Sequence, residues 1–312
     1  MRERSNGALP QWLLAVGPVL VLGSILGLLS LTTPFEALVA VDDASTLEIV
    51  WLLTVIGALA GVVPVAIGML WFPFIRDLDP RYLHGFLALA GGVLAFIAIQ
   101  LTVDIVETGL AADRTGLAMG LAVVGIVGTF VAMHAVSAWR QRTMAAADTD
   151  ANGLAIAYLV ALALGLHSIG EGLGIGVSFV RGDTTQVTLL VLAFVTHNVM
   201  EGPTVVAAVA RDRTAPPLRH FAAMGLLAGG PVILGGWLGS FANSAPLAVL
   251  FFAVAVGAIA QVLIEVAGLI RFDAEGVLTR TNVATFAVGF ALMFFLEDVL
   301  AGALLNGVLV PS

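Results

Sequence analysis

The chain has 312 residues, of which 60% are apolar and 11% charged, and its mean hydropathy is +1.05. A soluble globular domain has about 25% charged residues, so this chain has too little charge to cover a water-facing surface. The composition excludes an ordinary soluble domain and predicts a polytopic membrane protein. The net charge of −8 argues against nucleic-acid binding, and the absence of cysteine excludes disulfides and thiolate metal sites.

The first predicted element is an apolar run from about Trp12 to Leu31, which follows the charged start Met-Arg-Glu-Arg. A secretory signal has a similar order of charges, but its apolar region is only about 7–15 residues long. We therefore expect a retained transmembrane helix at 11–32, with a cleaved signal peptide as the alternative.

Apolar runs of about 20 residues predict membrane-spanning helices. The chain has nine such runs, at 11–32, 49–72, 83–109, 115–138, 153–180, 186–210, 218–242, 246–270 and 281–309. Their connections are short and contain Pro, Gly, Asp or Arg, which favour turns. We expect an all-α fold, namely a polytopic transmembrane bundle of nine helices.

The arginines predict the orientation, because basic residues concentrate on the cytoplasmic side of a membrane protein. With nine spans, Arg114 and Arg181 fall on one side, and eleven arginines fall on the other: Arg2, Arg4, Arg76, Arg81, Arg140, Arg142, Arg211, Arg213, Arg219, Arg271 and Arg280. This bias predicts an N-terminus inside and a C-terminus outside.

Two polar strings interrupt the apolar sequence near the middle of the chain. They read HSIGEG at 167–172 and HNVMEG at 197–202. In each string a histidine and a glutamate are four residues apart, so the two side chains share one helix face: His167 with Glu171, and His197 with Glu201. Both strings fall near the middle of helices joined by a short turn. We therefore expect them to face each other at the bilayer midplane.

Two imidazoles and two carboxylates form a ligand set that suits zinc, and also iron(II), manganese, cobalt or cadmium. Ser168 and Asn198 follow the two histidines and can add neutral oxygen ligands. The alternative is a purely structural polar network, but ionisable groups inside a membrane usually mark a function. Glycines at 165, 170, 172, 174 and 176 predict a helix side that either packs closely or leaves space for an ion.

Further charged residues fall within the predicted spans. Asp104, Glu107, Glu297 and Asp298 are predicted in the outer parts of their helices, and Glu265 in an inner part, one turn after Gln261. These side chains either extend to the interface or form an entry and an exit pathway for a cation. For His84, His134 and His220, which fall near cytoplasmic helix ends, we expect interfacial packing.

At the two polar strings the sequence resembles the ZIP (Zrt/Irt-like protein) family of divalent-metal transporters. Weaker similarities are found at LAGVVP (59–64), GGVLAFIAIQLTVDIVE (91–107), GAIAQVLIEV (257–266) and GFALMFFLEDVLAG (289–302), where Glu265 and Glu297 match acidic positions of the family. The resemblance implies an eight-helix transport domain at 49–312, preceded by an extra helix and an acidic outer loop at 1–48.

The resemblance also implies a binuclear-type metal site and uptake of metal into the cytoplasm. The first metal position would be formed by His167, Glu171, His197 and Glu201. The second, near Ser168 and Asn198, departs from the family pattern. Ser168 replaces a common asparagine, Leu94 replaces a methionine found in some members, and Gly230 replaces a common glutamate.

We expect a multi-pass cell-membrane transporter of zinc or a similar divalent cation, rather than an enzyme. No GxxxxGK[ST] string for ATP binding is found, so an ion gradient is the expected driving force. The expected partners are divalent metal ions and the lipid bilayer, with a homodimer as a further option and no nucleic acid. Two alternatives remain open: an intramembrane metal-dependent hydrolase, although a HExxH string is absent, and a non-transporting metal-binding membrane subunit.

Overall fold

The computed structural model describes residues 45–72, 80–146, 153–210, 216–273 and 276–305. These residues form helices joined by short connections and contain no strand, which confirms the all-α prediction for this part of the chain. The helix expected at 11–32 lies outside the described residues.

Each helix expected from residue 49 onwards is present as one helix or as an interrupted one. The elements are α3 (Thr46–Gly57), η1 (Ala58–Val62), α4 (Val63–Met69), α6 (Pro80–Leu110), α7 (Thr115–Ala146), α8 (Gly153–Val180), α9 (Thr184–Ala210), α10 (Leu218–Gly229), α11 (Pro231–Gly239), α12 (Ala245–Asp273) and α13 (Arg280–Leu305).

Six helical segments among the described residues are long and apolar enough to cross a membrane, which indicates a membrane-embedded protein. They are Thr46–Met69, Leu87–Leu110, Thr115–Trp139, Ala157–Val180, Leu218–Gly239 and Ala245–Gly268. The helices α9 and α13 are not among them, although Arg280–Phe295 of α13 is a shorter apolar helix. The count of nine spans and their direction in the bilayer therefore stay predictions.

The first described helix begins at a capping box. The hydroxyl of Ser45 accepts a hydrogen bond from the backbone N–H of Glu48, and the Glu48 carboxylate accepts one from the backbone N–H of Ser45. These two bonds satisfy N–H groups that have no partner within the helix, so α3 begins sharply at Thr46.

Two of the expected helices are interrupted at a proline. Between α3 and α4 the backbone widens into the π-helical turn η1, just before Pro64. Between α10 and α11 the interruption falls at Gly230, just before Pro231. Proline has no N–H to donate to the preceding turn, so a local break at these positions follows from the sequence.

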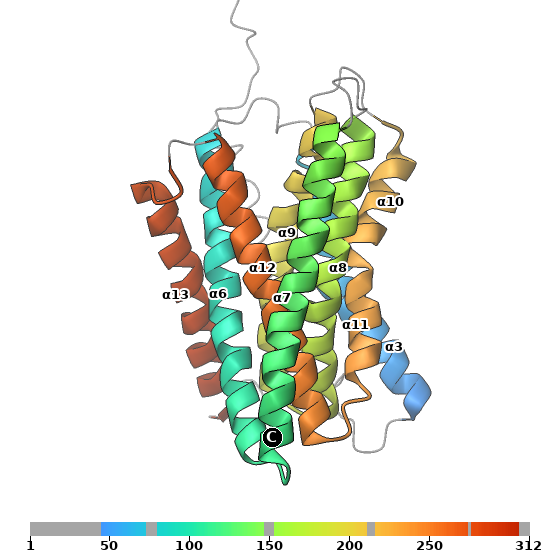
Figure 1. Ribbon diagram of the computed structural model, residues 1–312, viewed down its shortest axis with the longest axis vertical. Helices are drawn as coiled ribbons and strands as arrows, with labels where there is room; N and C mark the ends of the chain where they lie inside the picture. Colours follow the sequence, from blue (N-terminus) through green and yellow to red (C-terminus); the bar gives the residue numbers. More distant parts are fainter. Residues whose placement is uncertain (1–44, 73–79, 147–152, 211–215, 274–275, 306–312) are drawn as a thin grey trace, which may run out of the picture.

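The helices form a bundle in which α8 packs against α9, α10, α11 and α12 (Figure 1). The helices α6 and α13 pack together at one edge, and α12 lies between α6 and α7. Glycine brings α8 and α11 together. A Cβ atom added at Gly172 would overlap the carbonyl oxygen of Val232, and one added at Gly235 would overlap that of Ile169. The close packing predicted from the glycines of this helix is therefore confirmed.

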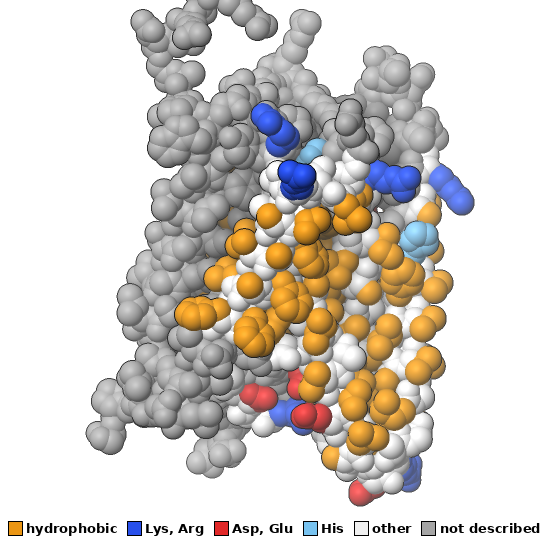
Figure 2. All heavy atoms as spheres, turned by 90° about the vertical axis from the view of Figure 1, so that its left-hand side faces the viewer, with side chains coloured by type: hydrophobic (Ala, Val, Ile, Leu, Met, Phe, Trp, Pro, Cys, Tyr) orange, Lys and Arg blue, Asp and Glu red, His pale blue; other side chains and the backbone are white. Residues whose placement is uncertain are grey.

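The surface has the pattern expected of a membrane protein. In Figure 2 hydrophobic side chains cover the middle of the described face, and arginine side chains gather mainly at its upper end. Large apolar side chains such as Val123 and Val127 of α7 are more than half exposed. Exposed apolar side chains in such number are stable against hydrocarbon rather than water.

Candidate metal centre

The site is formed by two antiparallel neighbours, α8 and α9. The turn between them consists of Arg181, Gly182 and Asp183, and Gly182 has a φ of +70°, a conformation that glycine adopts without strain. The Asp183 carboxylate accepts a hydrogen bond from the backbone N–H of Gln186, which caps the start of α9. This short connection confirms the predicted antiparallel pair.

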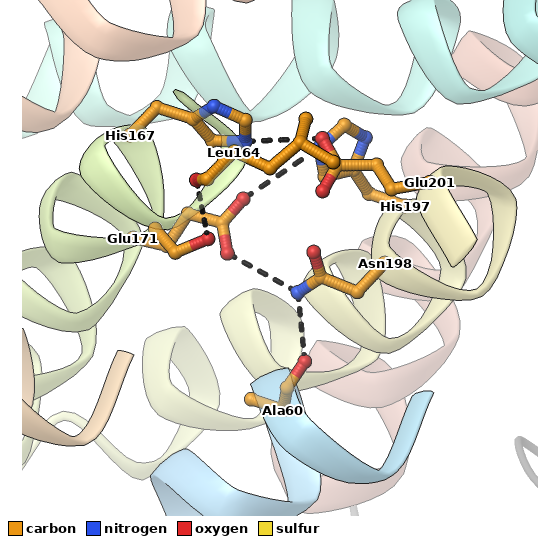
Figure 3. Close-up of polar contacts among 8 residues, drawn as sticks. Ala60, Leu164, His167, Glu171, His197, Asn198 and Glu201 are labelled. Atoms are coloured by element: carbon orange, nitrogen blue, oxygen red, sulfur yellow. Dashed lines mark hydrogen bonds and ion pairs between the residues drawn. The ribbon is translucent and has the colours of Figure 1, made fainter. Parts of the chain in front are cut away.

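The two polar strings converge between these helices, as Figure 3 shows. The Oε1 atom of Glu201 lies 3.0 Å from Nε2 of His167 and 2.6 Å from Nε2 of His197. The Oε1 atom of Glu171 lies 3.7 Å from Nε2 of His197. All four side chains are buried, with relative exposures of 6% or less. The predicted convergence of His167, Glu171, His197 and Glu201 is therefore present.

Three of these residues have the geometry of a metal-binding group. His167, Glu171 and His197 each offer one ligand atom, and the three atoms lie within 4.8 Å of one another. Ligand atoms in a tetrahedral zinc site, with bonds of 2.0–2.2 Å, are about 3.3 Å apart. Small side-chain rotations would therefore close the group around an ion.

The Glu201 carboxylate contacts both imidazoles. It forms a hydrogen bond with Nε2 of His167. Its contact with Nε2 of His197 is close, but this nitrogen has no directed hydrogen bond among the described residues. The carboxylate therefore compensates two buried imidazoles at once, and a cation that displaced it would find both nitrogens facing the same point.

Asn198 belongs to the site through Glu171. Its Nδ2 atom donates one hydrogen bond to Oε2 of Glu171, at 3.2 Å, and a second to the backbone carbonyl of Ala60, at 2.8 Å (Figure 3). The amide nitrogen thus holds the Glu171 carboxylate, while its buried Oδ1 has no hydrogen-bond partner among the described residues. That oxygen is the one available as a neutral ligand.

The Ala60 carbonyl is a member of the site that sequence reasoning missed. In a regular helix it would accept a hydrogen bond from residue 64, but residue 64 is proline and has no N–H. Because the turn η1 is π-helical and residue 64 has no N–H, the Ala60 oxygen accepts a hydrogen bond from Asn198 instead. In the sequence, Pro64 is the residue that indicates this break in the helix. Such π-helical turns often occur at functional sites.

Ser168 bonds to its own helix. Its hydroxyl donates a hydrogen bond to the carbonyl of Leu164, four residues earlier, at 3.0 Å. This is the usual bond of a serine inside a helix. Its proposed role as a ligand therefore stays a prediction without a contact to support it.

The expected pathway residues lie in separate groups. Asp104 is half-buried and accepts a hydrogen bond from Nε2 of Gln186, at 3.0 Å, whereas Glu107 is exposed. At the opposite end of the bundle, Ser137 of α7 donates to Glu265, at 2.8 Å, and accepts from Gln261, at 3.2 Å. The side chains of Glu297 and Asp298 lie outside the described residues.

The other three histidines lie outside this cluster. His134 is exposed and stacks on Phe130, and His220 forms a hydrogen bond with the hydroxyl of Tyr158. His84 is buried in α6. Interfacial packing, as expected from the sequence, agrees with the contacts of His134 and His220.

No model of a known protein family matches the chain, and no curated protein matches its sequence. The resemblance to the ZIP family therefore stays a prediction based on the two polar strings. The protein is a membrane-embedded helical bundle with a buried His/Glu/His cluster that could hold a metal ion.

Proposed function

We propose that the protein is a ZIP-like membrane transporter that moves zinc, or a similar divalent transition-metal cation, into the cytoplasm. One observation carries this proposal: the ligand atoms of His167, Glu171 and His197 lie within 4.8 Å of one another and are buried near the middle of two long helices. Transporters commonly bind their substrates near the bilayer midplane.

The chemistry of the ligands favours a cation that is bound and released. Imidazole and carboxylate ligands bind zinc, iron(II) and manganese, and they lack the thiolates typical of many permanent structural zinc sites. Glu201 already lies against both imidazoles, so it partly compensates the two histidines when no metal is present. Nε2 of His197 and Oδ1 of Asn198 have no hydrogen-bond partner among the described residues, and unpaired buried polar atoms of this kind favour binding of a cation.

Polar groups on either side of the site support a pathway. Asp104 and Gln186 form a pair on the side to which the arginine distribution assigns the outside. Glu265 lies towards the other end of the bundle, where it accepts a hydrogen bond from Ser137. In the proposed transport cycle a cation enters past Asp104, binds at the central site and leaves past Glu265.

The direct test is flux through the purified full chain reconstituted in liposomes. Uptake of radiolabelled zinc is measured against a panel of divalent cations as competitors, and metal stoichiometry is determined on the same preparation. Uptake above that of protein-free liposomes, with zinc bound in proportion to protein, supports the proposal. Stoichiometric zinc binding without flux would instead favour a non-transporting metal-binding subunit. If the protein shows no zinc binding and no flux, the polar cluster is a structural network and the proposal is wrong.

A further inference from the structure

A groove runs between α12 and α13, far from the candidate metal centre in the sequence. Both helices pack on α6, which forms the floor of the groove. The groove has a volume of about 330 Å³, which falls in the range of about 300–1,000 Å³ found for small-ligand sites. Representative lining residues from the floor, the two walls and the connection between α12 and α13 are Gly91, Leu263, Ile270, Val283, Phe286 and Leu278.

Two adjacent glycines of α6 explain why the groove exists. A Cβ atom added at Gly92 would overlap the carbonyl oxygen of Phe286, so this glycine lets α13 approach closely. A Cβ atom added at Gly91 would meet only side-chain atoms of Leu263 and Phe286, each at 3.7 Å. Packing therefore requires glycine at 92 but not at 91, where an added Cβ would make only ordinary van der Waals contacts.

The lining is suited to a hydrocarbon chain. Ten of the lining residues are apolar or glycine, and the remaining one, Asn282, uses its Nδ2 atom in a hydrogen bond to the carbonyl of Val277. One of the two N–H groups of this amide is therefore already used, and no other lining residue has a polar side chain. In a bilayer the surrounding solvent consists of acyl chains, which match such a surface.

Two exposed arginines lie at the helix ends next to one end of the groove. Arg271 directly follows Ile270 of one wall, and Arg280 lies two residues before Asn282 of the other. Both arginines are exposed, and both lie at the helix ends where the arginine distribution predicts the cytoplasmic surface. Residues 272–275, between them, include Asp273 and Glu275, and their side chains lie outside the described residues. Arginine near this surface attracts anionic headgroups.

We propose that this groove holds an acyl chain of an anionic phospholipid, whose phosphate lies against Arg271 and Arg280. The apolar groove would bind the acyl chain of the lipid, and the two arginines would bind its phosphate. The proposal is independent of the proposed transport function, because none of these residues belongs to the metal centre.

The test is lipid retention by the full chain purified in detergent, measured by native mass spectrometry. The protein is titrated with phosphatidylglycerol or with phosphatidylcholine of the same acyl chains. We expect tighter retention of phosphatidylglycerol. Because each arginine contributes roughly fivefold to binding at an anionic surface, the Arg271→Gln/Arg280→Gln variant should lose roughly 25-fold in affinity for this lipid. Ala267→Trp, which fills the groove, should lower the retention of both lipids.

Two variants serve as matched controls. Arg142→Gln/Arg219→Gln removes the same charge from exposed positions on α7 and α10, and Val127→Trp places the same indole side chain at an exposed position of α7. Neither should change retention, and unfolding temperatures report whether each variant is folded. Equal retention of the two lipids by the unmodified protein would overturn the headgroup assignment, as would no loss in the Arg271→Gln/Arg280→Gln variant. Unchanged retention by folded Ala267→Trp would overturn the groove itself.

Discussion

The side-chain amide of Asn198 donates a hydrogen bond to the backbone carbonyl of Ala60, across 138 residues of sequence. The same nitrogen also holds the Glu171 carboxylate of the candidate metal centre. The widened turn before Pro64 is therefore connected through one side chain to a carboxylate of the candidate metal centre.

This connection predicts a specific loss in Asn198→Ala. Removing the amide leaves the Ala60 carbonyl without its donor, and a buried unsatisfied group costs about 1–3 kcal/mol. We expect a lower unfolding temperature in detergent and weaker zinc binding by calorimetry, because Glu171 loses a bond that orients it. Thr196→Val is the control, since the Thr196 hydroxyl bonds only within its own helix turn, to Leu192. Equal effects of the two substitutions would contradict this role of Asn198.

Pro64→Ala provides a rescue test of the same connection. An alanine at 64 restores an N–H four residues after Ala60, so the carbonyl has an alternative donor. The loss of stability caused by Asn198→Ala should then be smaller in the Pro64→Ala background, with a coupling energy of about 0.5–3 kcal/mol in a double-mutant cycle. Strictly additive losses would show that the Ala60 carbonyl is not what Asn198 satisfies.

The contact between α8 and α11 predicts that Gly172→Ala is destabilising. The added methyl group would overlap the Val232 carbonyl, and forced overpacking costs about 1–3 kcal/mol. Thermal unfolding in detergent measures the effect. In Gly128→Ala, on α7, the added atom meets nothing within 4 Å, so this variant should be unchanged or stabilised by roughly 0.5–1 kcal/mol. A Gly172→Ala protein as stable as Gly128→Ala would contradict the close packing.

The hydrogen-bonded cluster of Ser137, Gln261 and Glu265 predicts a separation of transport from binding. Glu265→Gln removes a charge from the proposed exit while His167, Glu171 and His197 are retained. We expect slower zinc uptake in proteoliposomes with an unchanged amount of bound zinc per protein. Ser137→Ala, which removes a hydrogen bond to Glu265 but keeps the carboxylate, should have the smaller effect. Loss of zinc binding in Glu265→Gln would place this residue in the central site instead.

The sequence was informative where a pattern is local. The helix at 153–180 was predicted with the bounds that α8 has, and the four-residue spacing placed each histidine on a face with its glutamate. The short turn at Gly182 was enough to predict that the two helices are neighbours. Helix period and apolar length are properties of a single segment, so they can be read without a structure.

What could not be predicted depends on contacts between distant segments. The partner of Asn198 is set by the way η1 packs against α9, and nothing local to Asn198 indicates it. The sequence shows only that Ser168 can add a neutral ligand oxygen, and the structure is needed to show that its hydroxyl donates to the Leu164 carbonyl.

The central claim is that the converging histidines and glutamates carry a divalent cation. The most direct measurement is uptake of radiolabelled zinc into proteoliposomes by His167→Ala and Glu171→Ala, each at equal protein content and with its unfolding temperature recorded. His134→Ala, which changes an exposed histidine of α7, is the matched control. The account predicts that both site variants lose uptake while the control transports normally, and undiminished uptake by both folded site variants would contradict it.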